Sequence, residues 1–281
     1  EDAWALVAEA AGRVPALGVE KDHLTLAAYE ALKSRLGVTD AIDAGQEVRR
    51  LRSRKTPAEL ERHRRAAEVT DAVSEEVFQR LRVGVTEAEV ALWIAEAVAG
   101  AGCSLAFESS VQFGPNSAVP HHKPGGDRLK AGDVVLLDFG AAFEGYCADI
   151  TRVHAAGPLS ADLSRVHEVV LRANRAGVAA VKAGATAGAV DAAARAVIEE
   201  AGYGEAFVHR TGHGLGLEIH EDPSLDPGSG LVLEEGMVVT VEPGVYRPGL
   251  GGVRIEDDVV VEASGGLVLT SSDRSLRAIP E

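Results

Sequence analysis

The sequence predicts an α+β fold built from two related halves, each with two helices followed by two strands. Residues 81–102 align without gaps on residues 181–202, at an offset of 100. Further along the chain the offset becomes 104, which places Asp138 opposite Glu242. A match that includes helices, strands and an acidic residue indicates a pseudo-two-fold internal repeat. Each half is therefore expected to deliver carboxylates to a shared centre.

Two helix pairs are predicted by capping signals and by apolar residues that recur every three or four positions. The segment TPAE at residues 56–59 is a capping box with proline at the first helical position, and valines at four-residue spacing follow it. The segment TEAE at residues 86–89 begins a second helix in the same way. The other pair is expected over residues 160–182 and 186–201, so each half of the repeat begins with a helix pair.

Strands are predicted where short apolar runs are bounded by turn residues: near residues 105–113, 134–143, 148–155, 238–242, 252–261 and 267–269. The stretch VVLLDFGAAFEGYCADITRV, residues 134–153, contains an apolar run that leads into Asp138, then a glycine-rich reversal, and then Asp149. This pattern is typical of a hairpin with one acidic residue on each arm. A buried carboxylate costs several kcal/mol unless a proton, a counter-ion or a metal neutralises it.

Composition and charge limit the partners of the chain. It has 281 residues, 46% of them hydrophobic, and a formal net charge of −15. This charge argues against nucleic acid or an anionic membrane as the main partner, and no apolar run reaches the length of a membrane-spanning helix. The two cysteines, Cys103 and Cys147, do not suggest a disulfide framework, which predicts a reducing, cytoplasmic location.

Four acidic residues and one histidine are the candidate metal ligands: Asp138, Asp149, His213, Glu242 and Glu256. Taken alone, Glu242 is typical of a strand end before a Pro-Gly turn, and Glu256 belongs to an acidic cluster of the kind found at solvated edges. His213 lies between two glycines, which permit close approach to a ligand. Four converging carboxylates would repel one another unless cations lay between them. Oxygen-rich ligands with one imidazole suit Mn, Co or Fe, and four negative charges balance two divalent ions, ~3.5–4 Å apart.

The segments DFGAAFEGYCADITR, TGHGLGLEIHEDP, TVEPGVY and GGVRIEDD together resemble the pita-bread-fold metallopeptidases. Within that group the chain is most similar to the proline-specific branch, Xaa-Pro dipeptidase (prolidase) and aminopeptidase P. The resemblance implies that the five candidate ligands hold two divalent metal ions, with Asp149 and Glu256 bridging them. Manganese is expected first, with cobalt, iron or zinc as alternatives. The implied reaction is hydrolysis of the peptide bond that precedes proline in short peptides.

Further residues are expected to move protons, bind the substrate or orient a ligand. Arg254 precedes Glu256 by two residues, so on a strand it points to the same face and is expected to fix a carboxylate. The resemblance implies the remaining roles: Glu242 as the general base, His121 and His220 as hydrogen-bond donors to the substrate, and Phe107 and Ile219 as the lining of the proline pocket.

Residues 1–55 resemble the end of the smaller N-terminal domain of the family followed by a linker, and they are expected to have no core of their own. Residues 56–281 resemble its catalytic domain, and a homodimer is expected when the N-terminal domain is complete. The sequence does not decide between dipeptidase and aminopeptidase P, and the dipeptidase is taken as the first expectation. A dipeptidase needs a group that binds a free carboxylate near the proline, whereas aminopeptidase P needs open space there. Methionine aminopeptidase and a non-catalytic binding module on the same fold are more distant alternatives.

Overall fold

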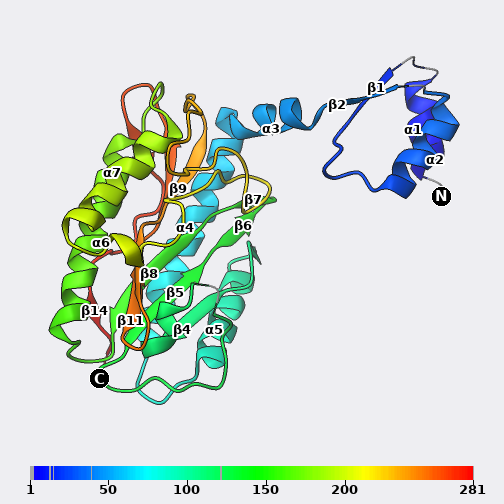
Figure 1. Ribbon diagram of the computed structural model, residues 1–281. Coiled ribbons are helices and arrows are strands. Elements are labelled where there is room, and N and C mark those ends of the chain that lie inside the picture. The colour runs from blue at the N-terminus through cyan, green and yellow to red at the C-terminus, as the bar shows by residue number, and fades with distance from the viewer. Residues whose placement is uncertain (1–2, 13, 15, 39, 121, 281) are drawn as a thin grey trace. The chain divides into compact units, whose positions relative to one another are not determined.

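The structure is a computed structural model that describes residues 3–12, 14, 16–38, 40–120 and 122–280, and it divides into two compact units, Glu1–Arg52 and Ser53–Glu281 (Figure 1). The smaller unit contains two short strands that pair in parallel, together with helices that precede and follow them. Its elements are α1 (Ala3–Ala11), β1 (Ala16–Val19), α2 (Leu26–Leu36), β2 (Asp40–Asp43) and most of α3 (Gly45–Ser53).

The smaller unit has an apolar cluster of its own, so the expectation that residues 1–55 lack a core is wrong. Leu32 and Leu36, four residues apart on α2, are buried together with Val38. Partly buried apolar residues of α1 and β1 pack against them. The four-residue spacing places both leucines on one face of the helix, which gives even this short segment a buried side.

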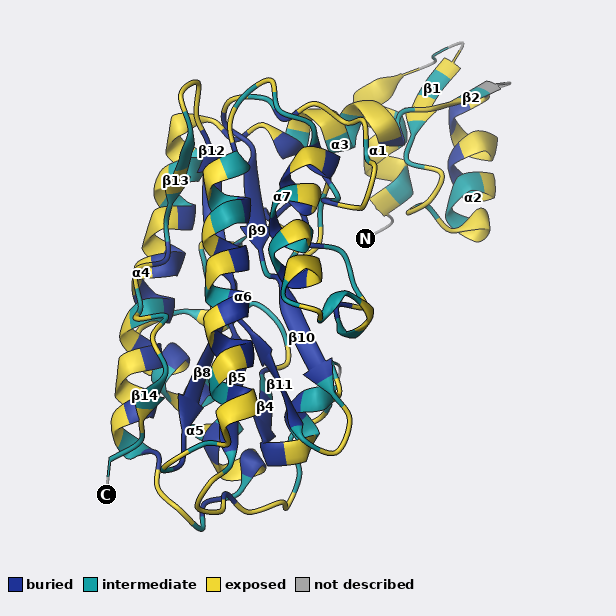
Figure 2. Ribbon diagram, turned by 60° about the vertical axis from the view of Figure 1, so that its left-hand side comes forward, coloured by how far each residue is buried: buried dark blue, intermediate teal, exposed yellow. Residues whose placement is uncertain are grey.

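The larger unit contains two helix pairs, α4 (Pro57–Arg80) with α5 (Glu87–Gly100) and α6 (Ala161–Ala180) with α7 (Ala187–Glu200). Both predicted capping boxes are confirmed, because the side chains of Thr56 and Thr86 accept hydrogen bonds from the backbone of the glutamates three residues later, which bond back to them. Buried side chains lie on one face of each long helix, and this face turns towards the strands (Figure 2).

Two sheets lie at the centre of this unit and form its core together with the helices that pack on them. The first is four-stranded, in the order β14-β8-β5-β4, and the second is three-stranded, in the order β13-β12-β9. Smaller sheets are formed by β10 with β11 and by β3, β6 and β7. The strands are β3 (Ser104–Leu105), β4 (Ser110–Phe113), β5 (Val134–Phe139), β6 (Ala141–Phe143), β7 (Tyr146–Cys147), β8 (Ile150–Ala155), β9 (Val238–Val241), β10 (Gly244–Arg247), β11 (Gly251–Arg254), β12 (Asp257–Val261), β13 (Gly266–Val268) and β14 (Arg277–Ala278).

The internal repeat is present in the backbone hydrogen bonds. In the first half the N–H of Gly84 donates to the carbonyl of Leu129 at 2.8 Å, and in the second the N–H of Gly184 donates to Leu233 at 2.9 Å. These pairs are related by the offsets of 100 and 104 found in the sequence. An equivalent backbone hydrogen bond therefore holds the turn between the two helices of each half, as the predicted pseudo-two-fold repeat requires.

Three of the predicted strands are interrupted: the segment near residues 105–113 divides into β3 and β4, and the other two interruptions lie beside candidate metal ligands. The segment near residues 134–143 breaks at Gly140, where a Cβ atom would lie 1.7 Å from the carbonyl oxygen of Ala148. The segment near residues 252–261 divides into β11 and β12, which pair with different strands, β10 and β9. Glu256 lies at this second break. The hairpin of β5 and β8 is confirmed, with Asp138 opposite Thr151.

Among the residues that the structure describes, none of the helices is long and apolar enough to cross a membrane. Both cysteines are free.

Candidate metal centre

A cavity of about 650 Å³ in the larger unit contains the five candidate ligands. They reach it from different parts of both halves: Asp138 from β5, Asp149 from the residue before β8, His213 from the loop that precedes β9, Glu242 from the residue after β9, and Glu256 from the break between β11 and β12. The cavity is also lined by Arg254 and His220 and by two half-buried apolar residues, Phe107 and Ile219. His121 lies outside the described residues.

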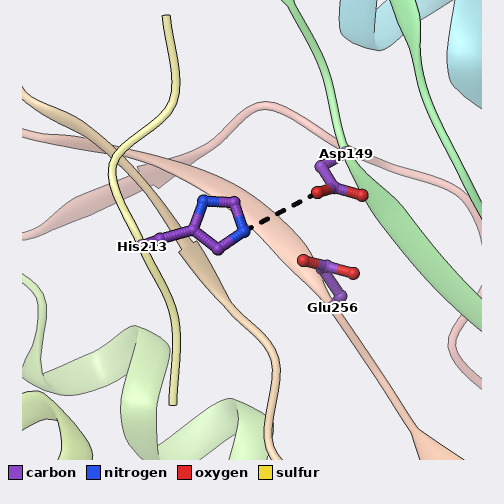
Figure 3. A group of neighbouring side chains, drawn as sticks. All are labelled: Asp149, His213 and Glu256. Atoms are coloured by element: carbon purple, nitrogen blue, oxygen red, sulfur yellow. Dashed lines mark ion pairs between the residues drawn. The ribbon is translucent and has the colours of Figure 1, made fainter. Parts of the chain in front are cut away.

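Three of these side chains form one close, buried group. Asp149, His213 and Glu256 are buried, and each offers an atom that lies within 4.8 Å of the others (Figure 3). The Nε2 atom of His213 is 3.8 Å from Oδ2 of Asp149. The two halves meet here because Thr151 forms an antiparallel bridge with Glu256 and donates its hydroxyl proton to Oε2 of Glu256 at 2.6 Å.

The other two carboxylates lie beside this group. Oε1 of Glu242 is 3.3 Å from Nε2 of His213 and accepts a hydrogen bond from the hydroxyl of Thr240 at 3.1 Å. Asp138 is ion-paired with Arg254, whose guanidinium donates to its Oδ2 atom. The charges of Asp138 and Glu242 both act on Glu256 and Asp149. The site therefore holds four mutually repelling carboxylates in one small volume.

The pKa values of three of these carboxylates are raised by burial and by this repulsion. Burial, followed by the charges of the neighbouring carboxylates, raises the pKa of Asp149 and of Glu256 well above their ordinary values. Burial also raises the pKa of Glu242 to about 7, although Arg254 opposes the shift. Asp149, Glu242 and Glu256 thus lie where a negative charge is unfavourable unless a cation is bound.

The backbone around His213 fixes the imidazole. A Cβ atom on Gly212 would lie 2.0 Å from the carbonyl oxygen of Thr240, and one on Gly214 would lie 2.2 Å from that of Asp222, so only glycine fits at either position. Nδ1 of His213 is 3.0 Å from the carbonyl oxygen of Gly214. An Nδ1–H that donates there leaves the lone pair of Nε2 for a ligand. Burial lowers the pKa of His213 to about 3, which keeps the ring neutral.

Arg254 connects the carboxylates to residues that the sequence did not identify. Its guanidinium donates to Asp138, to the hydroxyl of Thr151 at 2.9 Å and to the hydroxyl of Tyr246 at 2.9 Å. The Tyr246 hydroxyl is in turn 2.8 Å from Nε2 of His209. Tyr246 lies in the TVEPGVY segment, so the motif itself was the available signal. Thr151 likewise lies in the DFGAAFEGYCADITR segment, whereas His209 lies outside the quoted motifs and had no comparable signal.

The solvated-edge interpretation of Glu256 and its two neighbours is wrong, because all three residues are buried. Asp257 is ion-paired with Arg152 at 2.9 Å. Arg152, the basic residue nearest to Asp149 in the sequence, is therefore paired with Asp257. Asp258 accepts a hydrogen bond from the backbone N–H of Asp149 at 3.0 Å. This acidic cluster is therefore an internal support for the site.

The donor set fits a bound cation. Oδ1 of Asp149 is buried and has no hydrogen-bond partner within the described part of the chain. Buried carboxylate oxygens are normally paired, and an unpaired one beside a neutral imidazole and a second buried carboxylate is suited to metal coordination.

Comparison with known proteins identifies the family. Residues 61–263 match the metallopeptidase family M24, and residues 1–54 match the creatinase/prolidase N-terminal domain. The chain therefore belongs to the M24 family of metallopeptidases, and its larger unit has the pita-bread fold.

Several solved structures resemble the whole chain. An Xaa-Pro dipeptidase from Bacillus anthracis is 42% identical with a TM-score of 0.93, over 98% of this chain and 77% of that one. A prolidase from Pyrococcus furiosus is 36% identical with a TM-score of 0.91, over 98% and 81%. An X-Pro aminopeptidase from Thermotoga maritima is 36% identical with a TM-score of 0.92, over 98% and 78%.

Without metal, the Glu242→Gln variant is expected to change how stability depends on pH. The pKa of Glu242 is about 7 in the folded protein against an ordinary 4.5, so the folded state binds more protons than the unfolded state between these values. The free energy of unfolding contributed by Glu242 therefore falls as the pH rises, by up to about 3 kcal/mol. Urea unfolding in EDTA at pH 5 and pH 8 measures this, with the wild type losing more stability than the variant. An equal change in both proteins would contradict the account.

Proposed function

We propose that the chain is an Xaa-Pro dipeptidase that hydrolyses the peptide bond preceding proline. The observation that carries this proposal is the cavity in which Asp149, His213 and Glu256 converge, in an M24 metallopeptidase that is 42% identical to an Xaa-Pro dipeptidase. The creatinase/prolidase match of residues 1–54 argues against a methionine aminopeptidase. The full set of acidic residues and histidine argues against a non-catalytic binding module.

The proposed cofactor is a pair of divalent metal ions, with manganese expected first and cobalt, iron or zinc as alternatives. Asp138, Asp149, His213, Glu242 and Glu256 would hold them. Four carboxylates carry more charge than one divalent ion neutralises, and Arg254 compensates only part of the excess. When bound, the ions supply a water molecule of lowered pKa and polarise the carbonyl of the scissile bond.

The protein's own residues would bind the substrate and move the proton. Glu242 is expected to accept a proton from the attacking water and to deliver it to the departing proline nitrogen. His220 is exposed at the cavity and is expected to donate a hydrogen bond to the substrate or to the developing oxyanion, a role also predicted for His121. Phe107 and Ile219 would form the apolar slot for the proline ring. Such a slot supplies ~1–3 kcal/mol of preference.

Arg210 favours a dipeptidase over aminopeptidase P, the second candidate function. This half-buried arginine lines the cavity and donates to the hydroxyl of Ser224 at 2.9 Å. Within the described residues no carboxylate lies at ion-pair distance from its guanidinium, whereas Arg254 is bound to Asp138 and Lys123 to Glu108. An unmatched cation of this kind is suited to the free C-terminal carboxylate of a dipeptide.

The proposal extends to the organisation of the protein. We infer that residues 1–55 belong to a creatinase-type N-terminal domain with its linker and that residues 56–281 are the catalytic domain, which the positions of the two family matches support. A homodimer containing the complete N-terminal domain and a cytoplasmic location belong to the same proposal. Two free cysteines are consistent with a reducing compartment.

The function is tested by turnover of Ala-Pro and Ala-Pro-Ala with manganese or cobalt. The wild type is expected to cleave Ala-Pro, and Asp149→Asn is expected to lower kcat by roughly a hundredfold or more, because it removes a charged group from the site. Asp162→Asn, an exposed aspartate on α6, is the matched control and should retain full activity. If the wild type cleaves no Xaa-Pro substrate, or if Asp149→Asn retains full rate and metal content, the proposal fails.

Arg210→Ala is expected to lower kcat/KM for Ala-Pro by roughly ten- to a hundredfold, since a hydrogen-bonded charge pair contributes ~1.5–3 kcal/mol. Hydrolysis of Ala-Pro amide, which has no free carboxylate, should change by less than about twofold. Arg175→Ala on the exposed face of α6 serves as the control. An equal loss on both substrates would assign Arg210 another role.

A further inference from the structure

The chain between His213 and Glu221 forms a closed loop. Gly214 and Glu221 exchange two backbone hydrogen bonds, at 3.0 Å from the N–H of Gly214 and at 2.9 Å from the N–H of Glu221. The loop between them carries His220, whose ring centroid is 4.4 Å from that of His213 in an edge-to-face arrangement. The conformation of this loop therefore decides where His220 lies relative to the candidate metal ligands.

The carboxylate of Glu221 lies inside the loop. Its Oε1 atom accepts a hydrogen bond from the backbone N–H of Glu218 at 3.1 Å. A Cβ atom on Gly216 would lie 2.3 Å from Oε2 of Glu221, so the loop backbone passes directly over the carboxylate. The side chain of Glu221 is only 6% exposed. Burying a charged carboxylate is costly unless a positive partner and hydrogen bonds compensate it.

Lys55 is that partner, and it is anchored outside the loop. Its Nζ atom is 3.4 Å from Oε2 of Glu221, and its side chain is 1% exposed. The same Nζ donates to the carbonyl of Ser53 at 3.2 Å. The backbone N–H of Lys55 donates to the carbonyl of Gly236 at 2.8 Å, close to the start of β9, the strand that leads to Glu242. The lysine therefore connects the interior of the loop to the strand that carries a candidate ligand.

We propose that the buried Lys55–Glu221 ion pair positions His220 towards the substrate. This inference rests on the proposed function, in which His220 is a hydrogen-bond donor. Neither Lys55 nor Glu221 lines the cavity, so both act through the loop and are positioning residues. The pair holds the loop at its centre, while the backbone bonds of Gly214 and Glu221 hold it at its base. Without the pair, the backbone bonds still close the loop, but the side chain of Glu221, the residue that follows His220, loses its ionic anchor.

The test uses the isosteric Glu221→Gln variant, which keeps an acceptor for the N–H of Glu218 but removes the charge. It is expected to lower kcat/KM for Ala-Pro by roughly ten- to a hundredfold, the range found for residues that orient functional ligands. In a His220→Ala background the same substitution should cost less than about twofold, because its effect passes through His220. Equal losses in the two backgrounds would overturn the proposal.

Two controls separate positioning from a general loss of structure. Glu235→Gln changes an exposed glutamate elsewhere in the larger unit and should leave activity unchanged. If the Glu221→Gln variant fails to fold, the double variant Lys55→Met with Glu221→Gln removes both buried charges at once. It should fold and show the same loss and the same dependence on His220, and full activity in this double variant would overturn the proposal.

A measurement without turnover distinguishes this inference from the proposed function. Backbone hydrogen exchange in residues 214–221 is expected to be at least about tenfold faster in Glu221→Gln than in the wild type, since the side chain inside the loop loses its ionic anchor to Lys55. Unchanged exchange in this loop would overturn the positioning role. A wild-type protein that cleaves no Xaa-Pro peptide would instead refute the proposed function, while the exchange result would still decide whether the pair holds the loop.

Discussion

The repulsion among carboxylates at one point of the larger unit is the constraint on which the rest of the structure depends. Asp149 and Glu256 are buried, Asp138 and Glu242 lie beside them, and burial raises the pKa values of Asp149, Glu242 and Glu256. Arg254 is the cation bound to this group, and it is paired with Asp138. An arrangement that concentrates negative charge in this way is unfavourable for folding alone, so its presence indicates a metal-binding site.

The candidate ligands reach the cavity at places where strands are interrupted or where the chain forms a loop. The break at Gly140 brings the backbone of β5 against Ala148, next to Asp149, and the break between β11 and β12 exposes Glu256 to the same cavity. The glycines on either side of His213 allow the loop to pass against the backbone of Thr240 and Asp222. Each interruption costs backbone pairing or conformational freedom, and each lies beside a candidate ligand.

Much of this arrangement could be predicted from the sequence because its signals are local or periodic. The capping boxes at Thr56 and Thr86, the glycines around His213 and the two-part repeat are all visible in short segments. The supporting hydrogen bonds could not be predicted, because their partners are more than a hundred residues apart in the sequence. Examples are the contacts of Thr151 with Glu256 and of Asp149 with Asp258. The burial of Asp257 and Asp258 was missed for the same reason, since clustered acids are solvated unless distant partners such as Arg152 reach them.

The most direct test of the account is an anomalous-scattering map from crystals of the wild-type protein grown with manganese. The account predicts two peaks within the cavity, both in contact with Asp149 and Glu256, and neither present after treatment with EDTA. A single peak would contradict the two-metal arrangement. Peaks elsewhere, or none at saturating manganese, would show that the carboxylates are tolerated for some other reason and would remove the basis of the peptidase assignment.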